Sequence, residues 1–404
     1  MSKVLLQNSI INGEVMLPPS KSVAHRALIC SFLAGGGSVA PLINSNDILA
    51  TCGVIDSLKN SKVMLDCFES GSTLRFMIPV VAALGMDATF VGSGRLPQRP
   101  IGAYLDLLPQ HGVKCVSQGG LPLSISGKLT GGEFKIAGNV SSQYITGLLL
   151  ALPILEEDSR IVLTTQLESK PYIDMTIKVM ADYGVSVEET DYGYFVKGSQ
   201  KYNICDYVVE SDWSQAAFFL VAGAIGGEVK LKGLNLNSKQ GDKEIIDVLR
   251  RFGAEIDIND DFIICRKSNL HGIEVDATNI PDTVPAIAVA AAYASGNTVI
   301  SGAKRLRLKE SDRIESVANN LQKMGVNVVN TDDGMIIMPS GKLNGANLDG
   351  YNDHRIVMAF SVASLCANGQ TSITDAMSIN KSYPSFFSEY NKLGGRADVV
   401  CDRW

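Results

Sequence analysis

The chain has 404 residues, of which 46% are hydrophobic, and a formal net charge of −6. This length exceeds what one hydrophobic core usually holds, so we expect two domains. A net negative chain has no overall attraction for nucleic acid or for an anionic membrane, and neither is expected as a partner. Any anion site must therefore be a local cluster of lysine and arginine.

The first residues, MSKVLLQNSIINGEVMLPP, contain neither a signal-peptide core nor transit-peptide character, and no apolar run is long enough to span a membrane. None of the eight cysteines forms a CxxC pair or lies at zinc-like spacing from histidine. We expect reduced thiols, no metal site and a soluble cytoplasmic protein.

Residues 18–36 read PPSKSVAHRALICSFLAGG, which predicts a buried helix after a proline turn. Its first turn carries Lys21, Ser22, His25 and Arg26. Buried positive charge is costly unless a negative group meets it. The stretch therefore indicates an anion at the start of this helix.

Apolar helix candidates that follow a capping serine or aspartate recur along the chain. Their first residues are Ser20, Ser70, Ser141, Asp212, Asp282 and Asp353. From the second onward the spacings are 71, 71, 70 and 71 residues, whereas the first step is 50. A recurring α/β unit, truncated in its first copy, explains this regularity.

A glycine keeps the same interval, at positions 112, 184, 253, 325 and 394. An amphipathic helix pattern precedes each glycine and alternating strand residues follow it, so each is a candidate helix C-cap. The two sets of intervals together predict six copies of one unit.

A helix that is apolar on every face, such as TVPAIAVAAAYA, must be buried on every side. Six units in two sets of three would give two domains, each with strands and amphipathic helices around buried helices. Helix N-termini that converge on one surface of each domain would form, with the opposite surface, a cleft that holds anions.

Several chemically active side chains are predicted in loops or first turns rather than on amphipathic faces. The basic ones are Lys21, Arg26, Arg75, Arg99, Arg313, Arg355 and Lys381. Capping explains one serine of the SSQ stretch (Ser141, Ser142 and Gln143), and ligand contact is the alternative for the others. Asp282 is either an N-cap or a general base, and Glu310 either an ion-pair partner or an acid–base group.

The chain resembles the 5-enolpyruvylshikimate-3-phosphate synthase family over almost its whole length. The matching segments are PSKSVAHRAL, ESGSTLRF, LPQRPIG, SSQYITGLLL, SKPYIDMT, QGD, IPDTVP, KESDRI, YNDHRIVMAFS and NKSYPSFF. The resemblance implies an α/β (α+β) fold, a two-domain inside-out α/β barrel with three βαβαββ units in each domain, closing over the substrates. The domains would be residues 1–19 with 210–404, and residues 20–209.

The implied reaction transfers the enolpyruvyl group of phosphoenolpyruvate to the 5-hydroxyl of shikimate 3-phosphate and releases phosphate, without a cofactor. By resemblance, shikimate 3-phosphate would be held by Lys21, Ser22, Arg26, Ser141, Ser142, Gln143, Ser169, Tyr172, Asp282 and Lys309. Phosphoenolpyruvate would be held by Lys21, Gly71, Arg99, Gln143, Arg313, Arg355 and Lys381. Asp282 would accept the hydroxyl proton, and Glu310 with Lys21 would protonate the methylene carbon. Most relatives act as monomers, so a monomer is expected.

Three positions depart from the family pattern: Glu69 and Ser72 flank the loop glycine, and Phe76 replaces a frequent proline. They leave the response to the family inhibitor glyphosate open. The alternatives are a UDP-N-acetylglucosamine enolpyruvyl transferase, which usually has a loop cysteine where this chain has Gly94, a non-catalytic anion-binding homologue, and a structural repeat protein.

Overall fold

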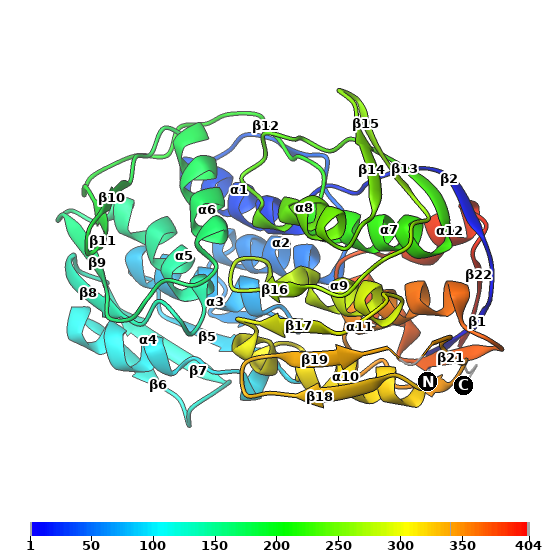
Figure 1. Cartoon of the computed structure of the whole chain (residues 1–404). Coiled ribbons are helices and arrows are strands. Elements are labelled where there is room, and N and C mark those ends of the chain that lie inside the picture. The colour runs from blue at the N-terminus through cyan, green and yellow to red at the C-terminus, as the bar shows by residue number, and fades with distance from the viewer. Residues whose placement is uncertain (1, 340, 402–404) are drawn as a thin grey trace. The chain divides into compact units, whose positions relative to one another are not determined.

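The computed structural model describes residues 2–339 and 341–401. The chain divides into two compact units. Unit 1 takes Met1–Pro18 and Glu210–Trp404, and unit 2 takes Pro19–Val209. The chain therefore leaves unit 1 after Pro18 and returns to it after Val209 (Figure 1).

Unit 2 alternates helices with short strands. Its helices are α1 (Lys21–Ala34), α2 (Asn46–Lys59), α3 (Gly71–Ala83), α4 (Gly102–Leu107), α5 (Ser142–Ala151) and α6 (Lys170–Asp182). Its strands are β3 (Val39–Ala40), β4 (Met64–Asp66), β5 (Ala88–Val91), β6 (Val113–Val116), β7 (Leu123–Gly127), β8 (Gly132–Ile136), β9 (Ser159–Leu163), β10 (Glu188–Thr190), β11 (Gly193–Val196) and β12 (Tyr207–Val208).

Unit 1 alternates in the same way. Its helices are α7 (Trp213–Gly226), α8 (Ile245–Arg251), α9 (Val284–Ala292), α10 (Arg313–Lys323), α11 (His354–Ala363) and α12 (Phe386–Lys392). Its strands are β1 (Ser2–Gln7), β2 (Ile11–Met16), β13 (Gly227–Lys232), β14 (Glu255–Ile258), β15 (Phe262–Arg266), β16 (Glu274–Asp276), β17 (Thr298–Ser301), β18 (Asn327–Asn330), β19 (Met335–Met338), β20 (Asn347–Leu348), β21 (Thr371–Thr374) and β22 (Arg396–Cys401).

Most described strands belong to four-stranded sheets that share one pairing pattern. In the sheet β4-β5-β7-β6, the first pair is parallel and the next two are antiparallel. The sheets β8-β9-β11-β10, β2-β13-β15-β14, β16-β17-β19-β18 and β20-β21-β1-β22 repeat this pattern, and β12 pairs in parallel with β3. The mixed α/β fold predicted from the sequence is confirmed, while the count of six units stays a prediction.

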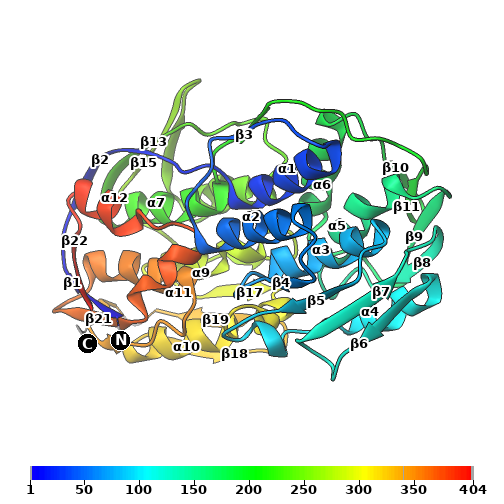
Figure 2. The same cartoon turned by 180° about the vertical axis from the view of Figure 1, so that it is seen from behind.

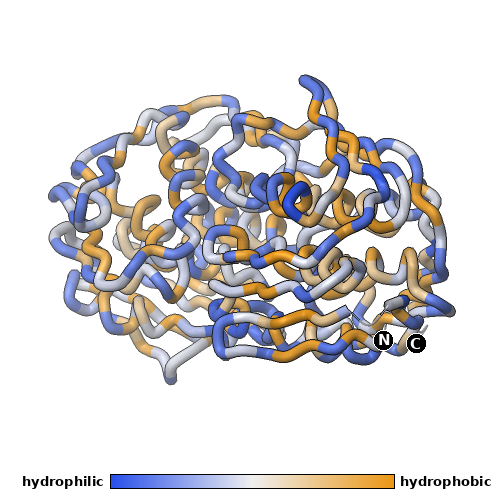
Figure 3. The backbone as a smooth tube through the Cα atoms, in the orientation of Figure 1, coloured by the Kyte–Doolittle hydropathy of each residue, from blue (hydrophilic) through white to orange (hydrophobic). Residues whose placement is uncertain are grey.

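The apolar helices are buried, as their composition requires. Every residue of α7 and of α9 is buried. Hydrophobic and hydrophilic stretches alternate along the whole chain (Figure 3), so that strands and amphipathic helices can cover these inner helices. Seen from behind, α1, α2 and α3 lie next to one another in unit 2 (Figure 2).

Five of the six predicted capping residues begin a helix as expected. Ser20, Ser70, Ser141, Asp212 and Asp353 each accept a hydrogen bond from a backbone N–H of the first turn. The sixth prediction is wrong. Asp282 lies inside the short 3₁₀ helix η5 (Pro281–Thr283), and Thr283 is the N-cap of α9, so the Asp282 carboxylate is not used for capping.

The recurring glycines end helices, as predicted. The residues at 112, 184, 253, 325 and 394 have φ from 80° to 102°. Only glycine adopts this left-handed conformation without a steric cost. The interval that the sequence shows is thus the interval between equivalent helix ends.

Helices α3 and α5 approach each other closely in unit 2. A Cβ atom on Gly147 of α5 would lie 2.4 Å from the carbonyl oxygen of Arg75 and 2.4 Å from the hydroxyl of Tyr104. That hydroxyl is 2.8 Å from the same carbonyl oxygen. The missing side chain at Gly147 therefore lets the backbone of Arg75 meet α5 directly.

The first and last strands of the described chain pair with each other. β1 runs antiparallel to both β21 and β22 (Figure 1), so unit 1 includes residues from both ends. Of the helices in the described residues, none combines the length and hydrophobicity that crossing a membrane requires.

We predict that Gly147→Ala destabilises the protein by about 2 kcal/mol, because the added methyl group must push α5 away from α3. Urea unfolding monitored by circular dichroism measures the effect. Gly53→Ala in α2 is the control, because its Cβ meets no atom within 4 Å, and it should add up to about 1 kcal/mol of helix stability. A Gly147 variant as stable as the Gly53 variant would contradict the close approach.

Candidate active site

Asp282 is the centre of a charged cluster in unit 1. Its Oδ1 accepts hydrogen bonds from Arg313 Nη1 at 3.0 Å and from Lys309 Nζ at 3.3 Å. Its Oδ2 accepts from Arg355 Nη2 at 3.0 Å, and Arg355 Nη1 also reaches its backbone oxygen at 3.1 Å. Lys309 and Arg313 from one segment and Arg355 from another therefore meet at one carboxylate.

Arg313 connects this carboxylate to two others. Its side chain is 1% exposed, and it donates to Glu310 Oε2 at 2.8 Å and to Asp353 Oδ2 at 2.8 Å. Asp353 also accepts from the backbone N–H of Arg355 as the cap of α11. Glu310 is therefore an ion-pair partner of Arg313, one of the two roles that the sequence left open.

The cations control the protonation of Asp282. Burial alone would raise the pKa of this carboxyl, but the charges of Arg355, Lys309 and Arg313 outweigh burial and hold the pKa well below its ordinary value. Burial acts against the charge of Arg313 as well, yet Asp353, Glu310 and Asp282 raise the pKa of its guanidinium. Asp282 and Arg313 are thus both charged at neutral pH.

Asp242, in the QGD segment, is a further carboxyl close to this cluster. It lies in the 3₁₀ helix η4 (Gly241–Glu244), is 3% exposed, and accepts a hydrogen bond from the Ser214 hydroxyl in the first turn of α7. Burial, followed by the negative charge of Asp282, raises its pKa to about 7, although Arg355 acts in the opposite direction. Near neutral pH Asp242 is therefore divided between its neutral and charged forms.

Lys381 ends the 3₁₀ helix η8 (Ala376–Lys381) and is 5% exposed. Its Nζ donates to the backbone oxygen of Asn352 at 2.5 Å. Asn352 directly precedes Asp353, the cap of α11, so Lys381 is held beside the start of the helix that carries Arg355.

In unit 2, Arg26 of α1 is 3% exposed and contacts neutral oxygens. Its guanidinium donates to Thr176 Oγ1 at 2.7 Å, to Ser22 O at 2.7 Å, to Tyr172 O at 3.0 Å and to Thr146 Oγ1 at 3.4 Å. None of these four acceptors carries a charge. Burial lowers the pKa of Arg26 to about 10, so the side chain stays cationic at neutral pH and its charge favours an anion.

Lys21 opens the same helix and forms an ion pair with Asp47 of α2, with 2.6 Å between Nζ and Oδ2. His25, one turn on, is buried and hydrogen bonds through Nδ1 to the Thr51 hydroxyl at 2.7 Å. Burial, followed by the charges of Lys21 and Arg26, holds the pKa of His25 well below its ordinary value, so this imidazole is neutral.

Gly71, Arg99 and Gln143 come together from three segments of unit 2. A Cβ on Gly71 would lie 2.5 Å from Nη1 of Arg99, so the guanidinium packs on the first turn of α3. Gln143 in the first turn of α5 donates from Nε2 to Ser72 Oγ at 3.0 Å. The bare glycine backbone and the glutamine amide therefore lie beside the same turn of α3.

The remaining predicted residues lie at helix starts of unit 2. Ser141 caps α5 and Ser142, which follows it, is buried. Ser169 is 3% exposed with φ 57° and precedes α6, where the N–H of Tyr172 donates to its backbone oxygen at 3.1 Å. The side chain of Ser169 does not cap this helix.

The structure thus brings the predicted residues into groups within each unit. Sequence reasoning missed four residues that interact with the predicted site residues: Asp47, Thr146, Thr176 and Asp242. It also missed the hydrogen bond between Arg75 and Gln143. Thr146 gave a weak signal because it lies one turn after Gln143 in the same helix. Asp242 lies in the matching QGD segment, which was not connected with a role. The others are distant in sequence from their partners, and no local pattern marks them.

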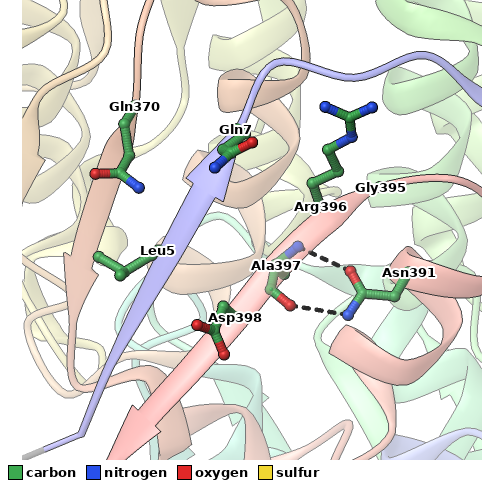
Figure 4. Close-up of a pocket in the computed structure, with 8 residues that line it drawn as sticks. All are labelled: Leu5, Gln7, Gln370, Asn391, Gly395, Arg396, Ala397 and Asp398. Atoms are coloured by element: carbon green, nitrogen blue, oxygen red, sulfur yellow. Dashed lines mark hydrogen bonds between the residues drawn. The ribbon is translucent and has the colours of Figure 1, made fainter.

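A separate pocket of about 310 Å³ lies on the surface of unit 1 (Figure 4). It is lined by Leu5, Gln7, Gln370, Asn391, Gly395, Arg396, Ala397 and Asp398, none of which is a predicted site residue. The Asn391 amide is paired with the backbone of Ala397. Among the described residues, no group of three or more histidine, cysteine, aspartate or glutamate side chains is arranged to bind a metal ion.

Comparison with known proteins identifies the family of this chain. The family model of EPSP synthase (3-phosphoshikimate 1-carboxyvinyltransferase) matches residues 42–390. A 3-phosphoshikimate 1-carboxyvinyltransferase of Clostridium novyi (strain NT) is 42% identical, with 100% of this chain and 99% of that protein covered. The chain belongs to the EPSP synthase family.

Solved structures of the family have the same fold. EPSP synthase from Acinetobacter baumannii has a TM-score of 0.83 and 26% identity, with 99% of this chain and 100% of that chain covered. The enolpyruvyl transferase NikO from Streptomyces tendae has a TM-score of 0.76 at 16% identity, over 100% of this chain and 99% of that one, a similarity in fold alone.

We predict that Asp242→Asn changes how stability depends on pH. The pKa of this carboxyl rises from an ordinary 3.8 to about 7 in the folded chain. The folded state then binds more protons than the unfolded state, so its stability falls as pH rises between these values. Asparagine does not titrate, so the variant should gain stability relative to the unaltered protein as pH rises from about 4 to about 7.

Urea unfolding midpoints at several pH values test this prediction. Asp260→Asn, at an exposed position of the same unit, is the control and should follow the unaltered protein. A constant difference between the Asp242 variant and the unaltered protein at every pH would rule out the raised pKa.

Proposed function

We propose that this chain transfers the enolpyruvyl group of phosphoenolpyruvate to the 5-hydroxyl of shikimate 3-phosphate and releases phosphate, as a 3-phosphoshikimate 1-carboxyvinyltransferase of the shikimate pathway. Family membership supports the activity, and the convergence of Lys309, Arg313 and Arg355 on Asp282 is the observation that carries the chemistry. The reported relatives bear this name, so the sugar-nucleotide alternative is not favoured. A cytoplasmic monomer is part of the same proposal.

Two sets of side chains recognise the substrates in this proposal. For shikimate 3-phosphate they are Lys21, Ser22, Arg26, Ser141, Ser142, Gln143, Ser169, Tyr172, Asp282 and Lys309. For phosphoenolpyruvate they are Lys21, Gly71, Arg99, Gln143, Arg313, Arg355 and Lys381. The buried charge of Arg26 supports a phosphate partner, because the four oxygens that accept its hydrogen bonds are neutral and leave its charge available to a phosphate.

Asp282 is proposed to accept the proton of the attacking hydroxyl. In the folded chain its pKa is too low for an effective base because three cations surround it. An anionic substrate that binds Arg355 and Arg313 would offset their charge, which raises the pKa of the Asp282 carboxyl toward the range of a general base. Substrate binding itself would thus prepare the base.

The carbon–oxygen bond then forms at C2 of phosphoenolpyruvate while its C3 gains a proton from the carboxyl of Glu310, which is protonated for this step, with Lys21 as a second donor. The resulting tetrahedral intermediate keeps its phosphate and carboxylate charges, which arginine and lysine side chains stabilise electrostatically. Glu310, now a carboxylate, takes back a proton from C3 as the C2–O bond to phosphate breaks, and the enolpyruvyl double bond is restored on the new oxygen. Every step uses side chains of this chain and the two substrates.

The deciding experiment is a coupled assay of phosphate release from the two substrates. Release should require both phosphoenolpyruvate and shikimate 3-phosphate, and should stop when UDP-N-acetylglucosamine replaces the latter. The absence of release from the correct pair, by protein whose folding is verified by circular dichroism, would overturn the proposed function.

We predict that Asp282→Asn lowers kcat by about a thousandfold, as expected when a general base is lost. Binding of shikimate 3-phosphate, measured by calorimetry, should be largely retained because Arg26 is untouched. Asp260→Asn is again the matched control and should keep full activity. An Asp282 variant with unchanged kcat would refute the assignment of the base.

We predict that Gly71→Ala raises the KM for phosphoenolpyruvate about tenfold, because the new Cβ displaces the Arg99 guanidinium and weakens a charge-assisted hydrogen bond. The guanidinium ends a flexible side chain, so the thermal unfolding temperature should hardly change. Gly102→Ala, where the added Cβ meets nothing within 4 Å, is the control. Equal KM values for the two variants would disprove the contact.

A further inference from the structure

Arg75 is a buried arginine of α3 to which the proposed mechanism gives no role. It is 3% exposed, and its guanidinium carbon lies 5.4 Å from the centre of the Tyr144 ring. Nη1 donates to Gln143 Oε1 at 2.7 Å, and Nη2 donates to Pro100 O at 2.9 Å. Arg75 therefore links α3, the first turn of α5 and the loop that follows Arg99.

The contact with Gln143 fixes which end of its amide is available. A guanidinium has only donors, so it can face the amide oxygen but not the amide nitrogen. The nitrogen must then point the other way, where one of its two N–H groups donates to Ser72 Oγ. The second N–H of Gln143 is consequently directed as a donor, which suits a carboxylate or phosphate oxygen.

The contact with Pro100 fixes the backbone that carries Arg99. The Pro100 oxygen accepts from Arg75 and also from the Tyr144 hydroxyl, so two donors hold one peptide group. Arg99 is the preceding residue, and its guanidinium packs against Gly71 at the start of α3. The same arginine thus supports two of the groups assigned to phosphoenolpyruvate.

Arg75 itself is held firmly. The Tyr104 hydroxyl lies 2.8 Å from its backbone oxygen and 2.9 Å from that of Tyr144, and Gly147 allows α5 to come against that backbone. Burial, followed by the charge of Arg99, lowers the pKa of the Arg75 guanidinium. Two like charges near each other raise the attraction of this region for an anion.

We propose that Arg75 is a positioning residue for phosphoenolpyruvate, which turns the Gln143 amide N–H toward the ligand and anchors the loop of Arg99. The inference rests on the proposed function, and it extends that function to a residue that acts through others. Without Arg75, the Gln143 amide can rotate and present its oxygen to the anion, which is repulsive.

The test measures both KM values for Arg75→Met, Arg75→Lys and the surface control Arg160→Met. Arg75→Met should raise the KM for phosphoenolpyruvate about tenfold, equal to one lost charge-assisted hydrogen bond. The KM for shikimate 3-phosphate should rise less than about threefold, because Gln143 is the one residue of its proposed set that Arg75 contacts. Arg75→Lys, which can replace one of the two contacts, should lie between. Arg160 is exposed on β9, and its variant should match the unaltered chain.

If Arg75→Met disrupted the structure of unit 2 as a whole, both KM values would rise, because Arg26, which is assigned to shikimate 3-phosphate, lies in the same unit. A nonselective rise would therefore overturn the inference. If Arg75→Met does not fold, Arg75→Lys combined with Gln143→Leu decides, because the effect of the lysine on the KM for phosphoenolpyruvate should shrink when Gln143 is absent. Additive effects of the two substitutions on the KM for phosphoenolpyruvate would also overturn the inference. If the unaltered chain releases no phosphate, the proposed function is overturned, and this inference with it.

Discussion

The carboxylate of Asp282 is the interaction on which the chemistry of unit 1 depends. Arg313 and Arg355 are almost completely buried, and side chains of this kind are stable there only with charged partners. Asp282 and Asp353 supply those partners from the starts of two helices. The same contacts keep Asp282 ionised, so protein stability and readiness for proton transfer have one physical origin.

Two buried arginines of unit 2, Arg26 and Arg75, have uncharged hydrogen-bond partners. Arg26 and Arg75 donate to hydroxyl, amide and carbonyl oxygens, which hold their guanidinium groups without cancelling their charge. A charge that is hydrogen bonded but not neutralised keeps its attraction for an external anion. Lys21, in contrast, forms an ion pair with Asp47, and it lies at the start of the helix that also carries Arg26.

Local pattern was sufficient for the fold class and for most helix starts. Ser20, Ser70 and Ser141 cap the helices that their sequences predict, because capping depends only on the next three residues. Asp282 does not cap α9, because a 3₁₀ turn precedes that helix, and its carboxylate binds the cations instead. Thr176, one partner of Arg26, lies 150 residues away in sequence, and the packing of α1 against α6 brings the two residues together.

The pairing of β1 with β21 and β22 has a consequence for biosynthesis. Unit 2 is one continuous stretch, Pro19–Val209, so it can fold on the ribosome as soon as that stretch has emerged. The strands β1 and β2 leave the ribosome earlier, yet their partners β13, β21 and β22 come much later. Strand β2 therefore stays unpaired until β13 has been synthesised, and β1 until β21 has been synthesised.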